Sequence, residues 1–137
     1  MSVADTIVYR VVLSLEGVRA EGGWMRSSPE QVRRYRQAIA ADGPGEDLAT
    51  VLDDLRRSGH EVTSKVLRGC PRGWRADHPR IGLARHTTLA AARNVPADQL
   101  EPGSTCSAAV ATAWRAMRPL VEWLRDNVGC REQHWRG

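Results

Sequence analysis

Lysine is almost absent from this chain, although 20 of its 137 residues are basic. Lys65 is the one lysine, and arginine supplies the rest. The codon preference of a GC-rich bacterial genome explains this bias without any function. The functional explanation is an anion site or a nucleic-acid surface, because guanidinium groups make forked contacts with carboxylates and phosphates. A net charge of +4 without any block of basic residues makes nucleic-acid binding unlikely as the main function.

Long apolar runs and paired cysteines are also missing. No run approaches the roughly 20 apolar residues that cross a membrane, and the start of the chain lacks the features of a signal peptide. We therefore expect a cytoplasmic protein that does not enter a membrane. The three cysteines form no C-x-x-C pair and are typical of reduced thiols. Cys130 and His134 have the spacing of zinc ligands, but no second pair accompanies them, so we expect neither a metal nor a cofactor.

Catalytic signatures form the third absence. The chain has no G-x-S-x-G, no P-loop, no H-E-x-x-H and no G-x-G-x-x-G. Cys70 lies near Arg68 and Arg72, and positive neighbours are a feature of reactive thiols, but a structural or incidental thiol is the simpler interpretation. The sequence therefore leaves open whether the protein is an enzyme.

The composition and pattern predict one folded α+β domain over residues 1–137, with an ordered core over about 6–128 and a tail over 130–137. Residues 6–14 and 18–21 favour a hairpin around Glu16-Gly17, with Gly22-Gly23 ending its second strand. Further strands are expected over 60–67 and 87–93. Helices are expected over 29–41, 46–57 and 105–128, separated at first by the breakers of 42–45 and bent in the last case at Pro119. The result is an antiparallel sheet of about four strands with helices packed on one face.

The stretch from Gly69 to Arg93 holds the densest chemistry of the chain. Asp77 and His78 suit a proton-transfer pair, although a simpler role for Asp77 is to cap a turn that begins at Pro79. The arginines of this stretch suit an anion site, although each of them could simply pair with a carboxylate or lie in solvent. Trp24 and Trp74, which follow glycines, suit a stacking platform, but covering the core or the sheet edge is the simpler role for both. The candidate ligand-binding residues are Arg72, Trp74, Arg75, Asp77, His78, Arg80, Arg85, His86 and Trp24.

Several short motifs occur in a distinctive order. They are Gly22-Gly23-Trp24, the helix residues Pro29, Val32, Tyr35 and Arg36, the loop residues Pro71 to Trp74 and Asp77 to Pro79, and the final-helix residues Pro119, Leu120, Trp123 and Leu124. In this respect the chain resembles, over roughly Ile7 to Val128, the bacterial family catalogued as domain of unknown function 2461. The resemblance implies an α+β fold and no assigned activity. Relative to that family the chain looks like a shortened member that lacks an N-terminal segment.

Three hypotheses for function follow. The first is a non-enzymatic binding or protein-interaction module that forms a homodimer, because a missing segment leaves apolar surface to cover. The alternative is a small-ligand (phosphate or carboxylate) binding protein, or an enzyme, that uses the Arg72–His86 loop as an anion site. Nucleic-acid binding is the weaker alternative.

Overall fold

The computed structural model describes residues 6–99 and 105–129. Its elements are β1 (Ile7–Ser14), β2 (Gly17–Trp24), α1 (Pro29–Ala40), α2 (Asp42–Arg57), β3 (Glu61–Thr63), α3 (Ile81–Ala84), β4 (Leu89–Pro96), the 3-10 turn η1 (Ala97–Gln99) and α4 (Thr105–Asn127). The strands form one antiparallel sheet in the order β1-β2-β4-β3. The α+β class and the four-stranded sheet expected from the sequence are therefore confirmed.

The hairpin of β1 and β2 is longer than the sequence indicated. Ser14 pairs with Gly17, so the turn consists of Leu15 and Glu16. We expected Gly22-Gly23 to end the second strand, and this was wrong, since β2 continues through both glycines. A Cβ at Gly23 would lie 2.5 Å from the Cα of Ala90 on β4. The glycine is thus needed for close approach between neighbouring strands, and it does not break the strand.

Helix α1 begins as its sequence predicted. The side chain of Ser28 accepts a hydrogen bond from the Gln31 backbone at 3.2 Å, and the Gln31 side chain accepts one from the Ser28 backbone at 3.2 Å. This reciprocal cap satisfies two of the backbone donors that have no partner within the helix. Tyr35 and Ile39 lie on the buried face of α1. The capping residues therefore determine where this helix begins, and the spacing of its apolar residues determines which face is buried.

The expected break at residues 42–45 is wrong, because these residues form the first turn of α2. A proline is tolerated in that turn, where its missing N–H has no helical acceptor, and Asp42 suits the positive end of the helix dipole. Gly45 is buried, and a Cβ there would lie 2.5 Å from Nε of Arg80. The glycine therefore makes room for a side chain that arrives from a distant segment.

The segment that follows α2 forms less strand than expected. β3 covers three residues, and beyond it the chain keeps only an isolated bridge between Val66 and His86. β4 begins two residues later than predicted and extends to Pro96. Asp77 does not cap a helix at Pro79, since α3 starts at Ile81 and its N-cap is Arg80. The stretch from 64 to 80 is thus a loop on the outside of the sheet edge.

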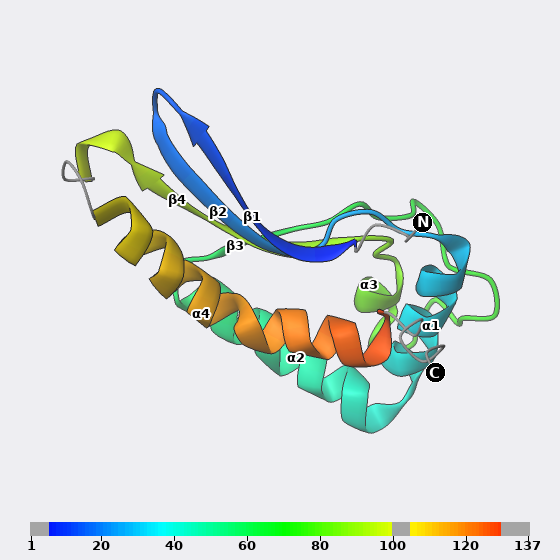
Figure 1. Cartoon of the computed structure of the whole chain (residues 1–137). Coiled ribbons are helices and arrows are strands. Elements are labelled where there is room, and N and C mark those ends of the chain that lie inside the picture. Colours follow the sequence, from blue (N-terminus) through cyan, green and yellow to red (C-terminus); the bar gives the residue numbers. More distant parts are fainter. Residues whose placement is uncertain (1–5, 100–104, 130–137) are drawn as a thin grey trace, which may run out of the picture.

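The longest helix, α4, lies across one face of the sheet and α2 packs beside it (Figure 1). The helix continues through Pro119, as expected. Trp114 anchors it to β2 by donating from Nε1 to the Glu21 carbonyl at 3.2 Å, and Trp123 joins it to α2 through the Pro44 carbonyl at 2.9 Å. α1 packs at the end of the sheet together with α3, and not over its face as the sequence suggested (Figure 1).

The core lies between the sheet and these helices. Met117, Leu120 and Leu124 of α4 are fully buried, as is Trp24 at the end of β2. Within the described residues, no helix is both long enough and apolar enough to cross a membrane. The arrangement leaves the outer side of α1 facing the loop that precedes α3, and the principal cavity lies there.

Candidate functional site

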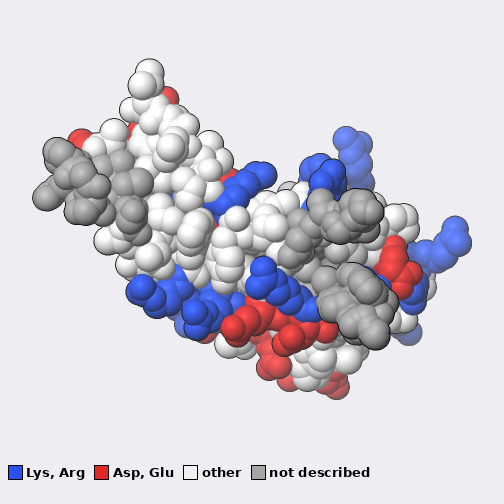
Figure 2. Space-filling model, in the orientation of Figure 1, with Lys and Arg blue, Asp and Glu red and all other residues white. Residues whose placement is uncertain are grey.

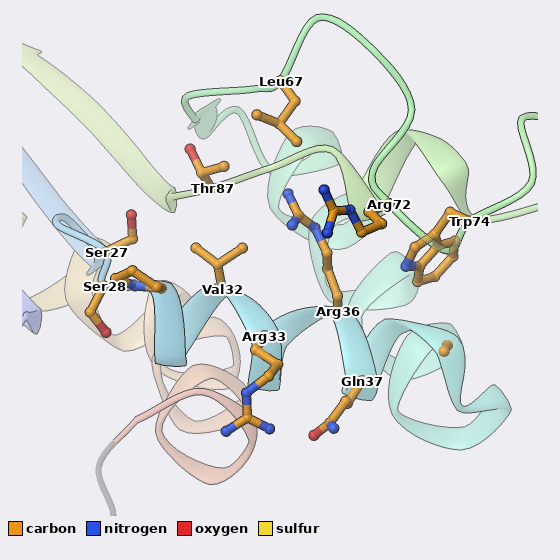
Figure 3. A pocket seen from close by; sticks show the side chains of 12 residues that line it. Ser27, Ser28, Val32, Arg33, Arg36, Gln37, Leu67, Arg72, Trp74 and Thr87 are labelled. Atoms are coloured by element: carbon orange, nitrogen blue, oxygen red, sulfur yellow. The ribbon is translucent and has the colours of Figure 1, made fainter.

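A groove of about 780 Å³ separates α1 from the loop of residues 67–74. One wall is a single face of α1, whose contributing residues recur at spacings of three and four: Pro29, Val32, Arg33, Arg36, Gln37 and Ala40. The opposite wall comes from Leu67, Arg72, Trp74 and Thr87, and Ser27 and Ser28 line one end. Figure 3 shows these side chains around the open space.

Arg36 is held firmly in this groove by a single hydrogen bond. Its Nε donates to the carbonyl oxygen of Ala84 at 3.0 Å, which fixes the guanidinium next to the end of α3. The Nη2 atom is buried and, among the described residues, has no hydrogen-bond partner. Burial lowers the pKa of Arg36 below its ordinary value. An unpaired donor on a desolvated cation costs free energy, and such groups normally have a partner.

Arg72 extends into the same groove from the opposite wall (Figure 3). In the described parts of the chain, no carboxylate pairs with Arg36 or Arg72. Arg33, the third arginine of the groove, pairs with Glu30 one turn earlier on α1, a carboxylate that it shares with Arg34. Two unneutralised guanidinium groups therefore face the groove, and together they suit a carboxylate or a phosphate, which accept forked hydrogen bonds.

Trp74 forms an apolar side of the groove and is positioned by its own loop. Its backbone N–H donates to the Pro71 carbonyl at 3.0 Å, and the Cys70 thiol donates to the Trp74 carbonyl at 2.9 Å. Gly73 has a φ of 85°, which a residue with a side chain rarely adopts. The indole also meets the His78 ring edge to face, with 4.6 Å between ring centres. These contacts hold the indole at the groove.

The remaining arginines of the predicted anion site lie apart from the groove. Arg75 is exposed and pairs with Asp77 at 3.1 Å. Arg80 donates to the Ile39 carbonyl at 2.7 Å and thereby closes the end of α1. Arg85 donates to the Leu67 carbonyl at 3.0 Å. Of the four arginines grouped by the sequence, only Arg72 lines the groove, while the other three hold backbone or a carboxylate.

Asp77 and His78 do not form a pair with each other. The carboxylate of Asp77 faces Arg75, as described above, and Nδ1 of His78 accepts a hydrogen bond from the Arg80 backbone at 3.0 Å. His86 lies outside the groove lining, and burial, followed by the positive charges of Arg56 and Arg85, lowers its pKa. Local contacts account for the positions of Asp77 and His78, whereas Nδ1 of His86 is buried and has no hydrogen-bond partner among the described residues.

Trp24 has no surface for a ligand. It is completely buried, its ring packs against Tyr35 with 5.4 Å between ring centres, and Nε1 donates to the Gln31 side chain at 3.4 Å. The expected stacking platform of Trp24 with Trp74 is therefore wrong. Here Gly22-Gly23-Trp24 marks the end of β2 where that strand packs closely against β4. Of Trp24 and Trp74, only Trp74 lines the groove.

Sequence reasoning missed Arg36 as a site residue. The pattern of α1 places Val32, Tyr35 and Ile39 on the buried side and predicts a solvent-facing side for its arginines. A clue was nevertheless present, because Arg36 follows Val32 by four residues and Ala40 follows Arg36 by four. That spacing forms a second, partly apolar stripe along the helix, and it faces the loop.

The charged surface and the cysteines give no comparable site. Figure 2 shows acidic and basic side chains interspersed along α2 and α4 without one dominant sign. Within the described residues no group of three His, Cys, Asp or Glu gathers to hold a metal ion. Cys130 and His134, whose spacing resembled zinc ligands, lie outside the described residues. Cys70 is exposed and free.

Comparisons with known proteins identify a family whose description names no activity. A family model described as "Conserved hypothetical protein (DUF2461)" matches residues 3–123. A search of the curated proteins finds no match. Among solved structures, an uncharacterized protein from Methanothermobacter thermautotrophicus is similar with a TM-score of 0.48 and 14% identity, covering 85% of this chain and 68% of that one.

Proposed function

Because the chain belongs to the DUF2461 family of conserved hypothetical proteins, whose description states no activity, we propose a function from its own groove: it binds a small carboxylate or phosphate between α1 and the loop of residues 67–74. The observation that carries this proposal is that Arg36 and Arg72 line one groove and that no carboxylate among the described residues pairs with either of them. Of the three functions expected from the sequence, this is the small-ligand alternative, and we place it ahead of the protein-interaction module.

Electrostatics support an anion as the missing partner. Arg36 and Arg72 carry like charges and line the same groove, so one bound anion can interact favourably with both guanidinium groups. A hydrogen bond to a charged group contributes about 1.5–3 kcal/mol, and a forked contact adds geometric selectivity.

The rest of the groove indicates what the ligand carries besides its acid group. Val32, Leu67 and Trp74 provide apolar wall beside the two arginines. Small-molecule sites commonly combine such apolar surface with a few placed polar groups. We therefore expect an acid attached to a flat or apolar body, which Trp74 contacts, to bind more tightly than inorganic phosphate or acetate.

Titration calorimetry with benzoate and phenyl phosphate tests the proposal, with acetate and inorganic phosphate for comparison and benzamide as the uncharged control. The aromatic acids should bind and benzamide should not. A ligand at one hundred times its Kd adds about 2.7 kcal/mol to folding stability, so thermal melts give a second readout. No heat and no melting shift with any of these acids would refute the proposal.

Three variants locate the site. Arg72→Ala removes an exposed side chain that makes no hydrogen bond or ion pair with another described residue, so the fold should survive while binding falls at least tenfold. Arg36→Gln should abolish binding. Arg75→Ala is the matched control, because Arg75 is an exposed arginine of the same loop outside the groove. Equal losses in Arg72→Ala and Arg75→Ala would indicate a diffuse charge effect and contradict the assignment.

Salt dependence separates this function from nucleic-acid binding, the weaker alternative. Contacts with several backbone phosphates weaken steeply as salt rises, whereas a single anion in a groove loses much less affinity. Binding of benzoate should therefore change less than tenfold between 50 and 200 mM salt, on the order of the release of one counterion.

A further inference from the structure

β1 is the outermost strand of the sheet, and its hairpin projects beyond the helices (Figure 1). Four large apolar side chains of this hairpin are exposed: Val11, Val12, Leu13 and Leu15, of which Leu13 is 71% and Leu15 99% accessible. Figure 2 shows the projecting part as mostly uncharged. Exposed apolar residues gathered in one place mark an interaction surface more often than scattered ones do.

The backbone of this edge is open to another strand. The Thr6 carbonyl accepts a hydrogen bond from the Met25 N–H beside the β1–β2 ladder, and the Glu16 carbonyl accepts one from the Ala97 N–H beside the β2–β4 ladder. These bonds fix which residues of each strand turn their backbone groups toward which neighbour. The even-numbered residues of β1 consequently bond to β2, and the odd-numbered ones turn their N–H and C=O groups outward. For Tyr9, Val11 and Leu13, the described residues supply no partner for these groups.

Nothing in β1 protects this edge. Proteins discourage edge pairing with proline, lysine, inward charges or a very short strand. β1 is eight residues long and contains neither proline nor lysine. Its one charge, Arg10, is drawn toward the neighbouring strand by an ion pair with Glu21. The opposite edge of the sheet, β3, is only three residues long.

We propose that a second copy of this chain covers the edge by antiparallel pairing of the two β1 strands about a two-fold axis at Val12. In this register Val11 lies opposite the partner's Leu13, Val12 lies opposite the partner's Val12, and Arg10 lies opposite the partner's Ser14. Apolar residues thus meet apolar ones, and the only charge meets a hydroxyl. The two sheets then form one continuous sheet, and the same surface of each copy makes the contact, as in a symmetric dimer.

Charge selects this register over its neighbours. The ladder phase requires odd-numbered residues to face odd-numbered ones, so the axis moves in steps of one residue. An axis at Arg10 places two arginines opposite each other, which is unfavourable. An axis at Val11 sets Arg10 against the partner's Val12 and buries a charge against an apolar side chain. The axis at Val12 avoids both, and it pairs residues 10–14 of the two β1 strands, whereas an axis at Leu13 would pair only residues 12–14.

Sedimentation velocity of the full chain over a concentration series tests the proposal. The wild-type chain should pass from monomer to dimer as its concentration rises through the micromolar range. Val12→Lys should remain monomeric, because the axis sets residue 12 against itself and two lysines would repel. Val66→Lys is the matched control, since Val66 is another exposed valine away from β1 and should leave the dimer intact.

Charge exchange tests the register itself. Val12→Glu alone should also be monomeric, and an equimolar mixture of Val12→Lys and Val12→Glu should recover a dimer containing one copy of each. Thermal melts of each variant confirm that the monomer is folded. A wild-type chain that stays monomeric at several hundred micromolar, a dimeric Val12→Lys, a monomeric Val66→Lys or a mixture that does not associate would each overturn the proposal.

Discussion

Replacing Gly23 by alanine tests the close approach of β2 and β4. Gly23 has a φ of 148°, outside the range that residues with a side chain ordinarily adopt. The new Cβ would stand 2.5 Å from the Cα of Ala90 and 2.6 Å from the carbonyl oxygen of Leu89. Both atoms belong to the backbone of β4, so neither moves without disturbing the ladder that pairs Gly23 with Ala90.

The magnitude follows from two contributions. A residue forced into a sparsely populated backbone region costs about 1–3 kcal/mol, and overpacking costs about 1–3 kcal/mol more. We expect Gly23→Ala to lower the free energy of unfolding by about 4 kcal/mol, which corresponds to a fall in Tm of roughly 15 °C for a domain of this size. That loss is a large share of the roughly 5–15 kcal/mol that stabilises a typical domain.

Urea unfolding followed by tryptophan fluorescence measures this difference. Gly82→Ala is the control, because Gly82 lies in α3 and nothing beyond its chain neighbours and its own helix stands within 4 Å of a Cβ added there. That variant should gain about 0.5–1 kcal/mol from the better helix propensity of alanine. A Gly23→Ala protein within 1 kcal/mol of wild type would show that the strands separate easily and that the steric reasoning is wrong.

Three further predictions concern other parts of the fold. Ser28→Ala removes the N-cap of α1 and should cost about 1 kcal/mol in urea unfolding, whereas Ser28→Asp should keep most of it. Arg80→Ala removes the hydrogen bonds to the Ile39 and Ala40 carbonyls and should cost about 2–3 kcal/mol, and a change below 0.5 kcal/mol would contradict that role. Burial lowers the pKa of both His60 and His86, so the stability that they contribute is complete above the unfolded pKa of about 6.5 and is lost as the pH falls below it. The Tm should therefore fall between pH 8 and pH 5.5, and it should fall less in a variant with both histidines replaced by glutamine. An equal fall in Tm for the two proteins would contradict this assignment.

Local signals in the sequence predicted the parts of the fold that depend on neighbouring residues. Ser28 and Gln31 stand three residues apart and cap α1 from within one turn. The apolar stripe of α4 stays in phase from Val110 to Val128 and passes through Pro119. In both cases the interacting groups are a few residues apart, so spacing alone determines that they meet.

Predictions failed where a distant segment decides the outcome. Residues 42–45 look like a helix break, yet they form the first turn of α2 with the side chain of Arg80 against Gly45. Gly22-Gly23 looks like the end of a strand, yet β4 packs closely enough to need it. The backbone preferences of glycine and proline permit both outcomes, and the long-range contact selects one of them.

The candidate site divides in the same way. The sequence by itself determined that Arg72 and Trp74 lie on an arginine-rich loop after Gly69, and that the fold is α+β. Only the tertiary structure decided that Arg36 lines the groove beside this loop, that Arg75 and Arg80 lie outside the groove, and that Trp24 is buried. The physical reason is that a charge acquires its role from its surroundings. The surroundings of Arg36 come from α1, the end of α3 and the loop of residues 67–74, which meet only when the chain folds.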